Sequence, residues 1–536
     1  MTEHRDAEHA EQTGHPRRWL ILGGLVFSLL VVVLDNTVLN VALKTMSEPK
    51  PKGLGASQSD LEWAINSYTL IFAGLLFTWG ILADRLGRKR ILMLGMVLFG
   101  LSSVLTAYAQ TPGELIAARA AMGFSGAAIM PSTLAIIANV FPRREQGKAI
   151  GIWSGSVGLA IAIGPVVGGA LLNNFWWGSV FLINVPIIVI AFVVMAVLLP
   201  ESKNPKPGRL DPVGVLLEMA GLVLFVYGII HAGDTGDWGN VTVWGSILLG
   251  AVLMAGFVFW ELRTDHPALD VRLFSNRQFS AAVIAVALTF FAMMGGMFFF
   301  SFYLQSVRGY SPLMSGVFML PFAVAMVVFA PLSATMVKRF GPRPVAVTGL
   351  LCIAAAMACY QFVTQSSAMW IYLLIAFIQG AAMANVMPPA TTTVMTSLPR
   401  QIAGVGSSVN NTVRQLGGAL GVAVLGTILT TAYRDRMQPL ISHVDTQLTP
   451  DQVHSVSGSI EATQQMVAGA AASGHPQAQQ LLQPANEAFV HAMHVTTVIG
   501  AAVMVLTALV VWLWLPKQVA APVGMDASAK AESVAA

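Results

Sequence analysis

The sequence contains little charge: only 10% of its 536 residues are Asp, Glu, Lys or Arg, whereas 55% are apolar. An ordinary soluble domain carries about 25% charged residues, so this chain has too few charges to cover a water-facing surface of its size. One bilayer span needs about 20 mostly apolar residues. The composition therefore argues against a cytosolic enzyme and favours a chain that crosses a membrane many times.

Cysteine is almost missing as well. The two cysteines, Cys352 and Cys359, are one heptad apart within a single apolar segment. Two cysteines at that spacing on one helix cannot form a disulfide. The cysteine content therefore gives no indication of the redox compartment.

Several motifs of energy coupling and catalysis are also absent. The sequence has no G-x-x-x-x-G-K-[ST] nucleotide loop, no H-E-x-x-H or G-x-S-x-G motif, and no repeated pore loop. We therefore expect neither an ATP-driven pump nor a channel. A membrane enzyme remains the alternative class, and it would need a metal or nucleophile cluster inside the bundle.

Long apolar segments, by contrast, run through most of the chain. Only helices and closed barrels satisfy their backbone in lipid, and barrel strands would be about ten residues long with alternating polarity. Continuous runs of this length predict an all-α polytopic membrane protein. We expect fourteen transmembrane helices at approximately 19–43, 61–83, 90–109, 114–141, 148–174, 178–199, 212–232, 241–261, 278–304, 312–337, 344–364, 369–396, 403–432 and 487–515.

The basic residues are distributed unequally between alternate loops. With fourteen spans both termini lie on one side, and about 22 of the 30 Lys and Arg residues fall on that side. Positive charge favours the cytoplasm, so we expect both termini to be cytoplasmic and the protein to lie in the cell inner (plasma) membrane. The net charge of +4 then reflects topology, and we expect no nucleic-acid partner.

The turn between the second and third spans reads G-I-L-A-D-R-L-G-R-K-R over residues 80–90. Its first glycine permits close helix approach and its second gives a permissive backbone. The pattern resembles the signature loop of the major facilitator superfamily. A degenerate copy of this turn occurs over 331–343, although it lacks the aspartate. An equivalent turn in each half is what duplicated six-helix halves would leave behind. The resemblance implies a conformational latch made of Gly80, Asp84, Arg85, Gly87 and Arg88.

The fourth span contains an arginine, Arg119. A charge inside a hydrophobic span costs several kcal/mol unless it has a partner or faces a polar cavity. Arg119 could lie near the membrane surface and extend its head group to water. The segment from Leu115 also resembles the proton-transfer motif of the superfamily, which implies a role in proton coupling.

The fifth span is rich in glycine and includes G-P-x-x-G-G over 164–169. Small residues let helices approach closely, and a proline bends the helix. Close packing alone would explain this pattern. It also resembles the motif that is associated with antiporters rather than symporters, which here would comprise Gly155, Gly164, Pro165, Gly168 and Gly169.

The first span contains an acid, Asp35, followed by Asn36 and Asn40. Asn36 and Asn40 share one helix face, and an acid inside the membrane is a functional hypothesis by default. The pattern L-D-x-T-x-x-N-V-A-L over 34–43 resembles fourteen-helix drug:proton antiporters of the EmrB/QacA type. F-L-I-N-V-P over 181–186 is also similar to that branch, and so are Tyr68 after Trp63 and the segment Tyr303-Leu304-Gln305.

The resemblance implies a division of the chain into two six-helix halves with two inserted helices. We expect an N-terminal half over 19–200, a linker and two inserted transmembrane helices over 201–277, and a C-terminal half over 278–516. Cytoplasmic tails would occupy 1–18 and 517–536, and an external loop would occupy 434–486. A helix near 460–467 and disorder are both compatible with the composition of that loop.

Further polar residues lie inside the spans. Arg414 in the thirteenth span could bind an anionic substrate, pair with Asp35 or have no direct role. Glu218 in the seventh span is compatible with either a structural role or a role in proton coupling. We expect the substrate cavity to include Asn36, Asn40, Tyr68, Tyr303, Gln305, Asn410, Asn411 and Arg414.

These features together predict a proton-coupled antiporter that exports hydrophobic or amphipathic small molecules by alternating access. Protonation of Asp35 would compete with substrate binding, and Arg119 would tune that acid from across the cavity. A dedicated exporter of one endogenous metabolite, such as an antibiotic or a siderophore, is the alternative, and an uptake symporter comes behind it. We expect a monomer in the lipid bilayer, with the proton gradient as energy source and neither cofactor nor metal.

Overall fold

The computed structural model describes residues 15–204, 208–264, 267, 269–398, 403–443, 450–472 and 476–515. Across these ranges the chain is helical and contains no β-strand. Fourteen of the described helical segments are long and apolar enough to cross a membrane, which confirms the expected number of spans. The tail expected over 517–536, and residues 1–14 of the other tail, lie outside the described residues.

The first six spans form the N-terminal half. α3 begins with a capping box in which Ser57 and Asp60 satisfy each other's backbone N–H groups, and α5 begins with the cap residue Thr111 followed by proline. The short α7 and α8 together make the sixth span. The helices are α2 (Arg18–Ser47), α3 (Gln58–Leu86), α4 (Arg88–Ala107), α5 (Pro112–Val140), α6 (Arg143–Asn174), α7 (Ser179–Leu182) and α8 (Asn184–Leu198).

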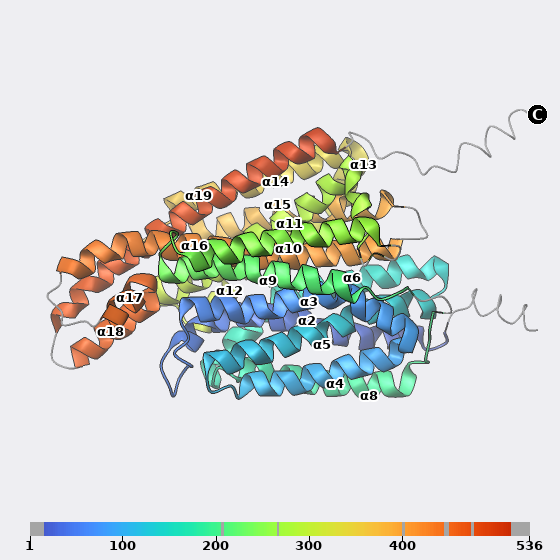
Figure 1. Ribbon diagram of the computed structural model, residues 1–536, viewed down its shortest axis with the longest axis horizontal. Helices are drawn as coiled ribbons and strands as arrows, with labels where there is room; N and C mark the ends of the chain where they lie inside the picture. Colours follow the sequence, from blue (N-terminus) through green and yellow to red (C-terminus); the bar gives the residue numbers. More distant parts are fainter. Residues whose placement is uncertain are drawn as a thin grey trace, which may run out of the picture.

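The next two spans, α9 (Pro212–Thr235) and α10 (Val241–Arg263), form a helical hairpin. Asp211 caps α9, and Gly236 ends it with φ of +69°. α9 packs against α3 of the N-terminal half and α16 of the C-terminal half. The inserted hairpin therefore spans the junction of the two halves, as Figure 1 shows.

The last six spans form the C-terminal half. A π-helical turn (Tyr303–Val307) extends the ninth span, and α12 and α13 together make the tenth. The helices are α11 (Arg277–Phe302), α12 (Pro312–Val317), α13 (Leu320–Phe340), α14 (Pro342–Cys359), α15 (Met369–Thr396), α16 (Ala403–His443) and α19 (Leu482–Trp514).

The same tight turn occurs once in each half. Gly87 joins α3 to α4 with φ of +121°, and Gly341 joins α13 to α14 with φ of +86°. Backbone in this region favours glycine because it lacks a Cβ atom. The repeat supports an internal duplication, and we call the end of the bundle that carries both turns the Gly87–Gly341 end.

The opposite end carries two helices outside the spans, α17 (Pro450–Gly458) and α18 (Ile460–Ala472); they lie at the left of Figure 1, and we call this the α17–α18 end. The 41 residues of α16 make about 60 Å of helix, twice the hydrocarbon thickness of about 30 Å. Residues 434–443 therefore continue a spanning helix where a loop was expected. Of the two possibilities left open for 460–467, the helix is present, as part of α18.

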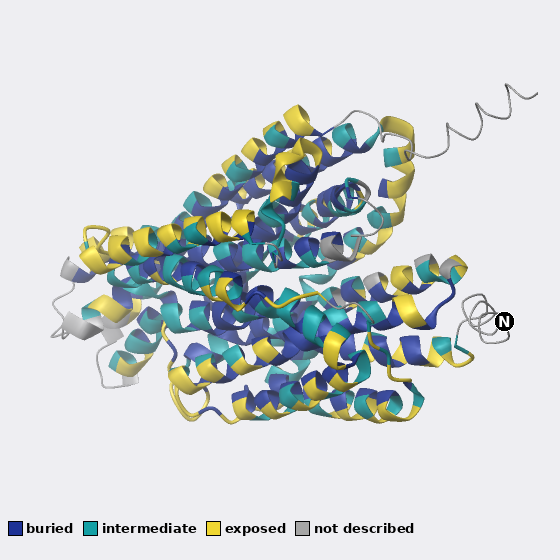
Figure 2. Cartoon of the chain, turned by 45° about the vertical axis from the view of Figure 1, so that its right-hand side comes forward, coloured by how far each residue is buried: buried dark blue, intermediate teal, exposed yellow. Residues whose placement is uncertain are grey.

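Exposure follows the outer faces of the bundle (Figure 2). Only 17% of the residues in the most apolar 18-residue stretch of α10 are buried. In the ninth span, which comprises α11 and the π-helical turn, 72% of the corresponding residues are buried. Apolar side chains such as Leu248, Val252 and Phe259 of α10 are exposed. An apolar exposed surface of this extent suits a helix in contact with lipid.

Candidate functional site

Asp35 and Arg119 form a buried ion pair between α2 and α5. Arg119 Nη1 bonds Asp35 Oδ2, and the two residues are 1% and 0% exposed. Asn184 at the start of α8 donates to Asp35 Oδ1 at 3.1 Å and to Ser103 Oγ at 3.1 Å. Three helices of the N-terminal half thus converge on one carboxylate.

The guanidinium of Arg119 is enclosed by protein on its other sides. Its Nε donates to the carbonyl of Ala64 at 3.1 Å, its Cζ lies 4.4 Å from the ring centre of Tyr68, and Phe181 follows at 5.8 Å. A side chain that extended to the membrane surface would be exposed. That interpretation of Arg119 is therefore wrong, because the ion pair and the aromatic faces satisfy the charge internally.

The pair differs from the expected arrangement in one respect. Arg119 contacts Asp35 directly and does not act from across a cavity. Two polar atoms beside the pair, Arg119 Nη2 and Asn184 Oδ1, have no hydrogen-bond partner among the described residues. Buried polar atoms without a protein partner commonly bind water, so hydrogen-bonding capacity remains free beside the pair.

A cavity of about 80 Å³ lies between the two halves, at the centre of the bundle. Helices α2, α3, α5 and α6 line it from one side, and α11 and α16 line it from the other. Four of the expected substrate-cavity residues line it: Asn36, Asn40, Asn411 and Arg414. We call this space the central cavity.

The other four expected cavity residues lie elsewhere. Tyr68 is packed against Arg119, and Asn410 Oδ1 accepts from Thr391 at 3.5 Å. Tyr303 donates to the carbonyl of Thr364 at 2.8 Å, and Gln305 donates to the carbonyl of Val41 at 3.0 Å. Their expected place in the cavity is corrected, because each points to a neighbouring helix or loop.

Arg414 does not pair with Asp35, one of the three possibilities that the sequence left open. Its guanidinium lies 4.5 Å from the ring centre of Phe290 in α11, and it lines the central cavity. No ion pair links it to a residue in the described part of the chain. The central cavity therefore carries an uncompensated positive charge.

Polar contacts and glycines close the α17–α18 end of the interface between the halves. Lys44 Nζ donates to the carbonyl of Gln305 at 2.7 Å. A Cβ atom on Gly169 of α6 would lie 2.5 Å from the carbonyl oxygen of Pro312 and 2.6 Å from Leu313 Cα. The backbones of α6 and α12 therefore touch at this end, and only glycine permits the contact.

The same face of α6 is open toward the Gly87–Gly341 end. Gly155 lies fourteen positions before Gly169, four helical turns away on the same side of the helix, and a Cβ atom there would meet nothing within 4 Å. Gly164 and Gly168 pack against Thr37 and Val38 of α2. Among the expected antiporter residues, Gly164, Gly168 and Gly169 make close contacts near the α17–α18 end, whereas Gly155 makes none. The two halves therefore meet at the α17–α18 end and separate toward the Gly87–Gly341 end.

The expected latch residues lie together at the Gly87–Gly341 end. Arg88 bonds Asp84 at 2.9 Å and donates to the carbonyl of Ala135 in α5 at 3.2 Å. Asn204, after the sixth span, donates its backbone N–H to the carbonyl of Asp84 at 3.0 Å. These contacts tie α3, α4, α5 and the following segment to one another.

The remaining latch residues extend the same network. Arg85 donates to the carbonyl of Gly208 at 2.8 and 3.0 Å. A Cβ atom on Gly87 would meet Glu201 Oε1 at 2.6 Å, and one on Gly80 would lie 3.7 Å from Pro131. All of these partners precede α9, so these contacts hold the N-terminal half together.

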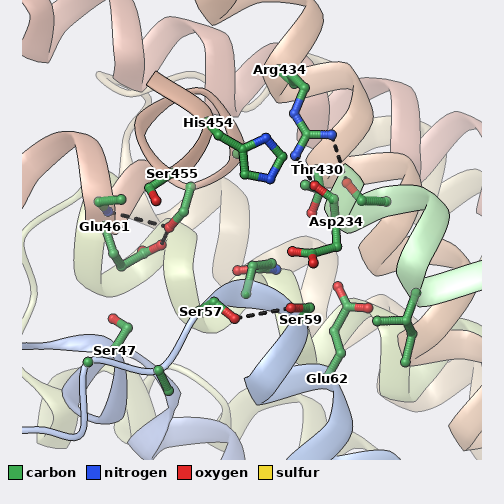
Figure 3. A pocket seen from close by; sticks show the side chains of 18 of the residues that line it. Ser47, Ser57, Ser59, Glu62, Asp234, Thr430, Arg434, His454, Ser455 and Glu461 are labelled. Carbon is green, nitrogen blue, oxygen red and sulfur yellow. Dashed lines mark hydrogen bonds between the residues drawn. The ribbon is translucent and has the colours of Figure 1, made fainter. Parts of the chain in front are cut away.

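A polar cavity of about 250 Å³ lies at the α17–α18 end (Figure 3). Arg434 reaches from the extension of α16 to the carbonyls of Gly233 and Asp234 at 2.8 and 2.6 Å. Glu461 of α18 accepts from Ser306 at 2.6 Å and from Ser459 at 3.0 Å. Burial raises the pKa of the Glu461 carboxyl above its ordinary value.

Sequence reasoning assigned no role to Asn184 and Ser103, although both join the network around Asp35. The amide of Asn184 stands alone in an apolar run, and that isolation was a usable signal. Across the described ranges, no group of three or more His, Cys, Asp or Glu side chains could hold a metal ion.

Comparison with known proteins places the chain in a family. The profile of the Major Facilitator Superfamily matches residues 25–422. The chain is 34% identical to the multidrug efflux pump LfrA of Mycolicibacterium smegmatis, over 92% of this chain and 96% of that protein. It is 32% identical to the methyl viologen resistance protein SmvA of Salmonella typhimurium, over 94% and 99% of the two chains.

Solved structures agree on the fold. A bacterial homologue of the human lysosomal transporter Spinster, in an inward-facing and unoccupied conformation, superposes with a TM-score of 0.63. The two are 19% identical, and the match covers 94% of this chain and 99% of that one. Two six-helix halves, a signature turn in each half and a family profile over most of the chain lead to one conclusion: this protein belongs to the major facilitator superfamily, a family of transporters.

Proposed function

We propose that the protein is a proton-coupled antiporter that exports hydrophobic or amphipathic small molecules. Its relatives support an export function, since one is named a multidrug efflux pump and another a methyl viologen resistance protein. The observation that carries the proposal is the buried Asp35–Arg119 pair beside a cavity between two halves. A carboxylate inside a membrane that has one strong partner can exist in two states, paired or protonated.

The membrane orientation follows from the basic loops. Lys and Arg concentrate at the Gly87–Gly341 end, and positive charge favours the cytoplasm. The protein would then lie in the plasma membrane with both termini cytoplasmic. The interface is closed at the α17–α18 end and open along Gly155, so the conformation described above is inward-facing.

The ion pair links protonation to conformation. A proton on Asp35 removes the negative charge that holds Arg119, and leaves a buried guanidinium without its counter-ion. The paired, deprotonated state accordingly accompanies the inward-facing conformation, and Asp35 takes up its proton from outside. Release of that proton to the cytoplasm restores the pair, and substrate leaves in the opposite direction.

The walls of the central cavity suit amphipathic molecules. Asn36 and Asn40 supply polar groups from α2, and Asn411 supplies one from α16 on the opposite wall. An adjoining apolar cavity of about 40 Å³ shares Ile161 and Met293 with it and adds the flexible Met297 and aromatic groups. Drug-sized ligands occupy about 300–1,000 Å³, so a substrate would also use the open space along α6.

Transport in proteoliposomes tests this function. With an imposed proton gradient, the wild-type protein should export a fluorescent hydrophobic dye, and the Asp35→Asn variant should lose gradient-driven export. Asp237→Asn is the matched control, because Asp237 is exposed in the α9–α10 turn. Undiminished gradient-driven export by Asp35→Asn would overturn the proposal.

A further inference from the structure

The inserted hairpin covers a cavity of about 370 Å³ that is separate from the central cavity. We call it the lateral cavity. α9 and α10 form its outer wall, the segment 269–274 closes one end, and α16 with Phe77 of α3 forms the inner wall. Its lining comprises Phe77, Glu218, Leu222, Met254, Phe257, Val258, Leu269, Val271, Phe274, Val409, Thr412, Val413 and Leu416.

Glu218 is the one charged residue in this lining. It lies two turns into α9 and is half-buried. No hydrogen bond or ion pair joins it to another residue in the described ranges, and the charged residue that acts on it electrostatically is another acid, Glu261. An unpaired carboxylate in a spanning helix is costly, so its retention needs an explanation.

Basic side chains near the lateral cavity are engaged elsewhere. The guanidinium of Arg263 lies 4.1 Å from the ring centre of Phe259 on α10. Arg272 donates to the carbonyl of Leu262 at 2.8 Å. Asp211, the other nearby acid, accepts from Trp260 Nε1 at 3.0 Å. None of these contacts involves Glu218, which leaves it as the one ionisable group that lines the lateral cavity.

A second polar atom points to a missing ligand. Thr412 of α16 lines the same cavity and is 3% exposed. Its Oγ1 has no hydrogen-bond partner within the described part of the chain. Buried hydroxyl groups in proteins nearly always find a partner, so an unmatched hydroxyl and an unmatched carboxylate face one space.

The rest of the lining defines the chemistry of the ligand. Phe77, Phe257 and Phe274 contribute three aromatic rings, and Met254 contributes a polarisable sulfur. Aromatic faces attract cations, and apolar walls with few polar groups are typical of small-molecule sites. A hydrophobic molecule with a single positive charge complements all of these features.

The central cavity differs in charge, although it lies against the same helix. On α16, Thr412 and Val413 face the lateral cavity, whereas Asn411, Arg414 and Gln415 face the central cavity. Arg414 makes the central cavity repel cations, and Glu218 makes the lateral cavity attract them. The two cavities are therefore suited to different ligands or to different parts of one.

We propose that the lateral cavity binds a hydrophobic monovalent organic cation, with Glu218 as its counter-ion and the inserted hairpin as its outer wall. The site adds a ligand class to the proposed export function, but binding itself does not depend on that function. A binding measurement therefore tests the lateral cavity separately from the export function. Export could fail while the cation still binds, and export could persist while the lateral cavity binds no cation.

Calorimetric titration of the purified full-length protein tests the proposal. The probe is methyltriphenylphosphonium, and triphenylphosphine oxide is the uncharged control of similar shape. We expect Glu218→Gln to weaken binding of the cation at least tenfold and to leave binding of the oxide unchanged. Asp237→Asn, on the exposed turn of the same hairpin, should leave both affinities unchanged.

A cavity-filling variant makes the test independent of the carboxylate substitution. Val258 is 44% exposed at the rim of the cavity, so Val258→Trp should fold, fill the space and abolish binding of the cation while Glu218 is intact. Three results would overturn the proposal: an unchanged affinity in Glu218→Gln, an equal loss for the uncharged control, or full binding by Val258→Trp.

Discussion

Four of the charged side chains inside the membrane-spanning helices form two contrasting groups. Asp35 and Arg119 bond each other, are almost completely buried and belong to the N-terminal half. Arg414 and Glu218 have no ion-pair partner among the described residues, and each lines a cavity. A paired charge responds to protons because protonation breaks the pair, whereas an unpaired charge on a cavity wall responds to ligands.

The largest expected effect comes from breaking the pair. Arg119→Leu leaves the Asp35 carboxylate buried without its partner, and removing one member of a buried pair costs about 3–5 kcal/mol. We expect a clear fall in thermal stability, measured by dye-monitored unfolding in detergent. Asp35→Asn combined with Arg119→Leu should recover much of that loss, because no buried charge remains. A double variant that is no more stable than Arg119→Leu would contradict the account.

Arg414→Leu sharpens the comparison in the same assay. Arg414 has no ion-pair partner among the described residues, so its removal leaves no buried charge unpaired. We therefore expect the free energy of unfolding to change by less than about 1 kcal/mol. A loss as large as that of Arg119→Leu would mean that the two arginines do not differ as proposed.

The second effect concerns the two ends of α6. Gly169→Ala places a Cβ atom against the backbone of Pro312 and Leu313, and overpacking of this kind costs about 1–3 kcal/mol. The closed α17–α18 end should be disfavoured, so that the outward-facing population rises about five- to 150-fold. Distances between spin labels on α6 and α12 would measure this shift.

Gly155→Ala is the matched control for this change. It adds the same methyl group to the same helix, where nothing lies within 4 Å. Export and spin-label distances should remain those of the wild type. Equal effects of the two substitutions would refute the end-to-end difference that the structure describes.

A smaller effect is expected from the charge of the central cavity. Arg414→Gln removes the cation that lies over Phe290 and leaves the cavity neutral. Affinity for cationic dyes should rise by up to about tenfold, and affinity for anionic dyes should fall. Fluorescence titration with one dye of each charge measures both changes, and a parallel change for the two dyes would argue against an electrostatic role.

The smallest effect concerns Glu461 at the α17–α18 end. Because burial raises its folded pKa, the carboxyl favours the folded state below its unfolded pKa, and this contribution is lost as pH rises through the folded value. Glu461→Gln should therefore melt about 1–2 °C above the wild type at pH 8, with the gap closing toward pH 4. A gap that does not depend on pH would contradict this assignment.

Sequence patterns were sufficient to predict the membrane spans and the turn at Gly87. Apolar runs of spanning length predicted all fourteen helices, and G-x-L-a-D-R-x-G-R-k-R predicted the Gly87 turn that joins α3 and α4. These features depend on neighbours in sequence. The length of α16 was underestimated because its extension is held by tertiary contacts that hydropathy cannot foresee: Arg434 bonds carbonyls of α9, and Met437 and Ile441 are buried.

Side-chain destinations were less predictable. Periodicity showed that Asn36 and Asn40 share a face, and both line the central cavity. It could not show that Tyr68 of α3 turns to Arg119 of α5, because the direction of a face depends on how helices pack. Asp35 and Arg119 were expected to cooperate, but their direct contact depends on the tertiary arrangement of α2 and α5.

Substrate-induced proton release tests the central claim most directly. Purified protein in weakly buffered detergent receives an exported dye, and a pH indicator reports protons that leave the protein. If protonation of Asp35 and substrate binding exclude each other, the wild type releases protons on binding, and Asp35→Asn binds the dye without releasing any. Equal proton release from the wild type and Asp35→Asn would contradict the account.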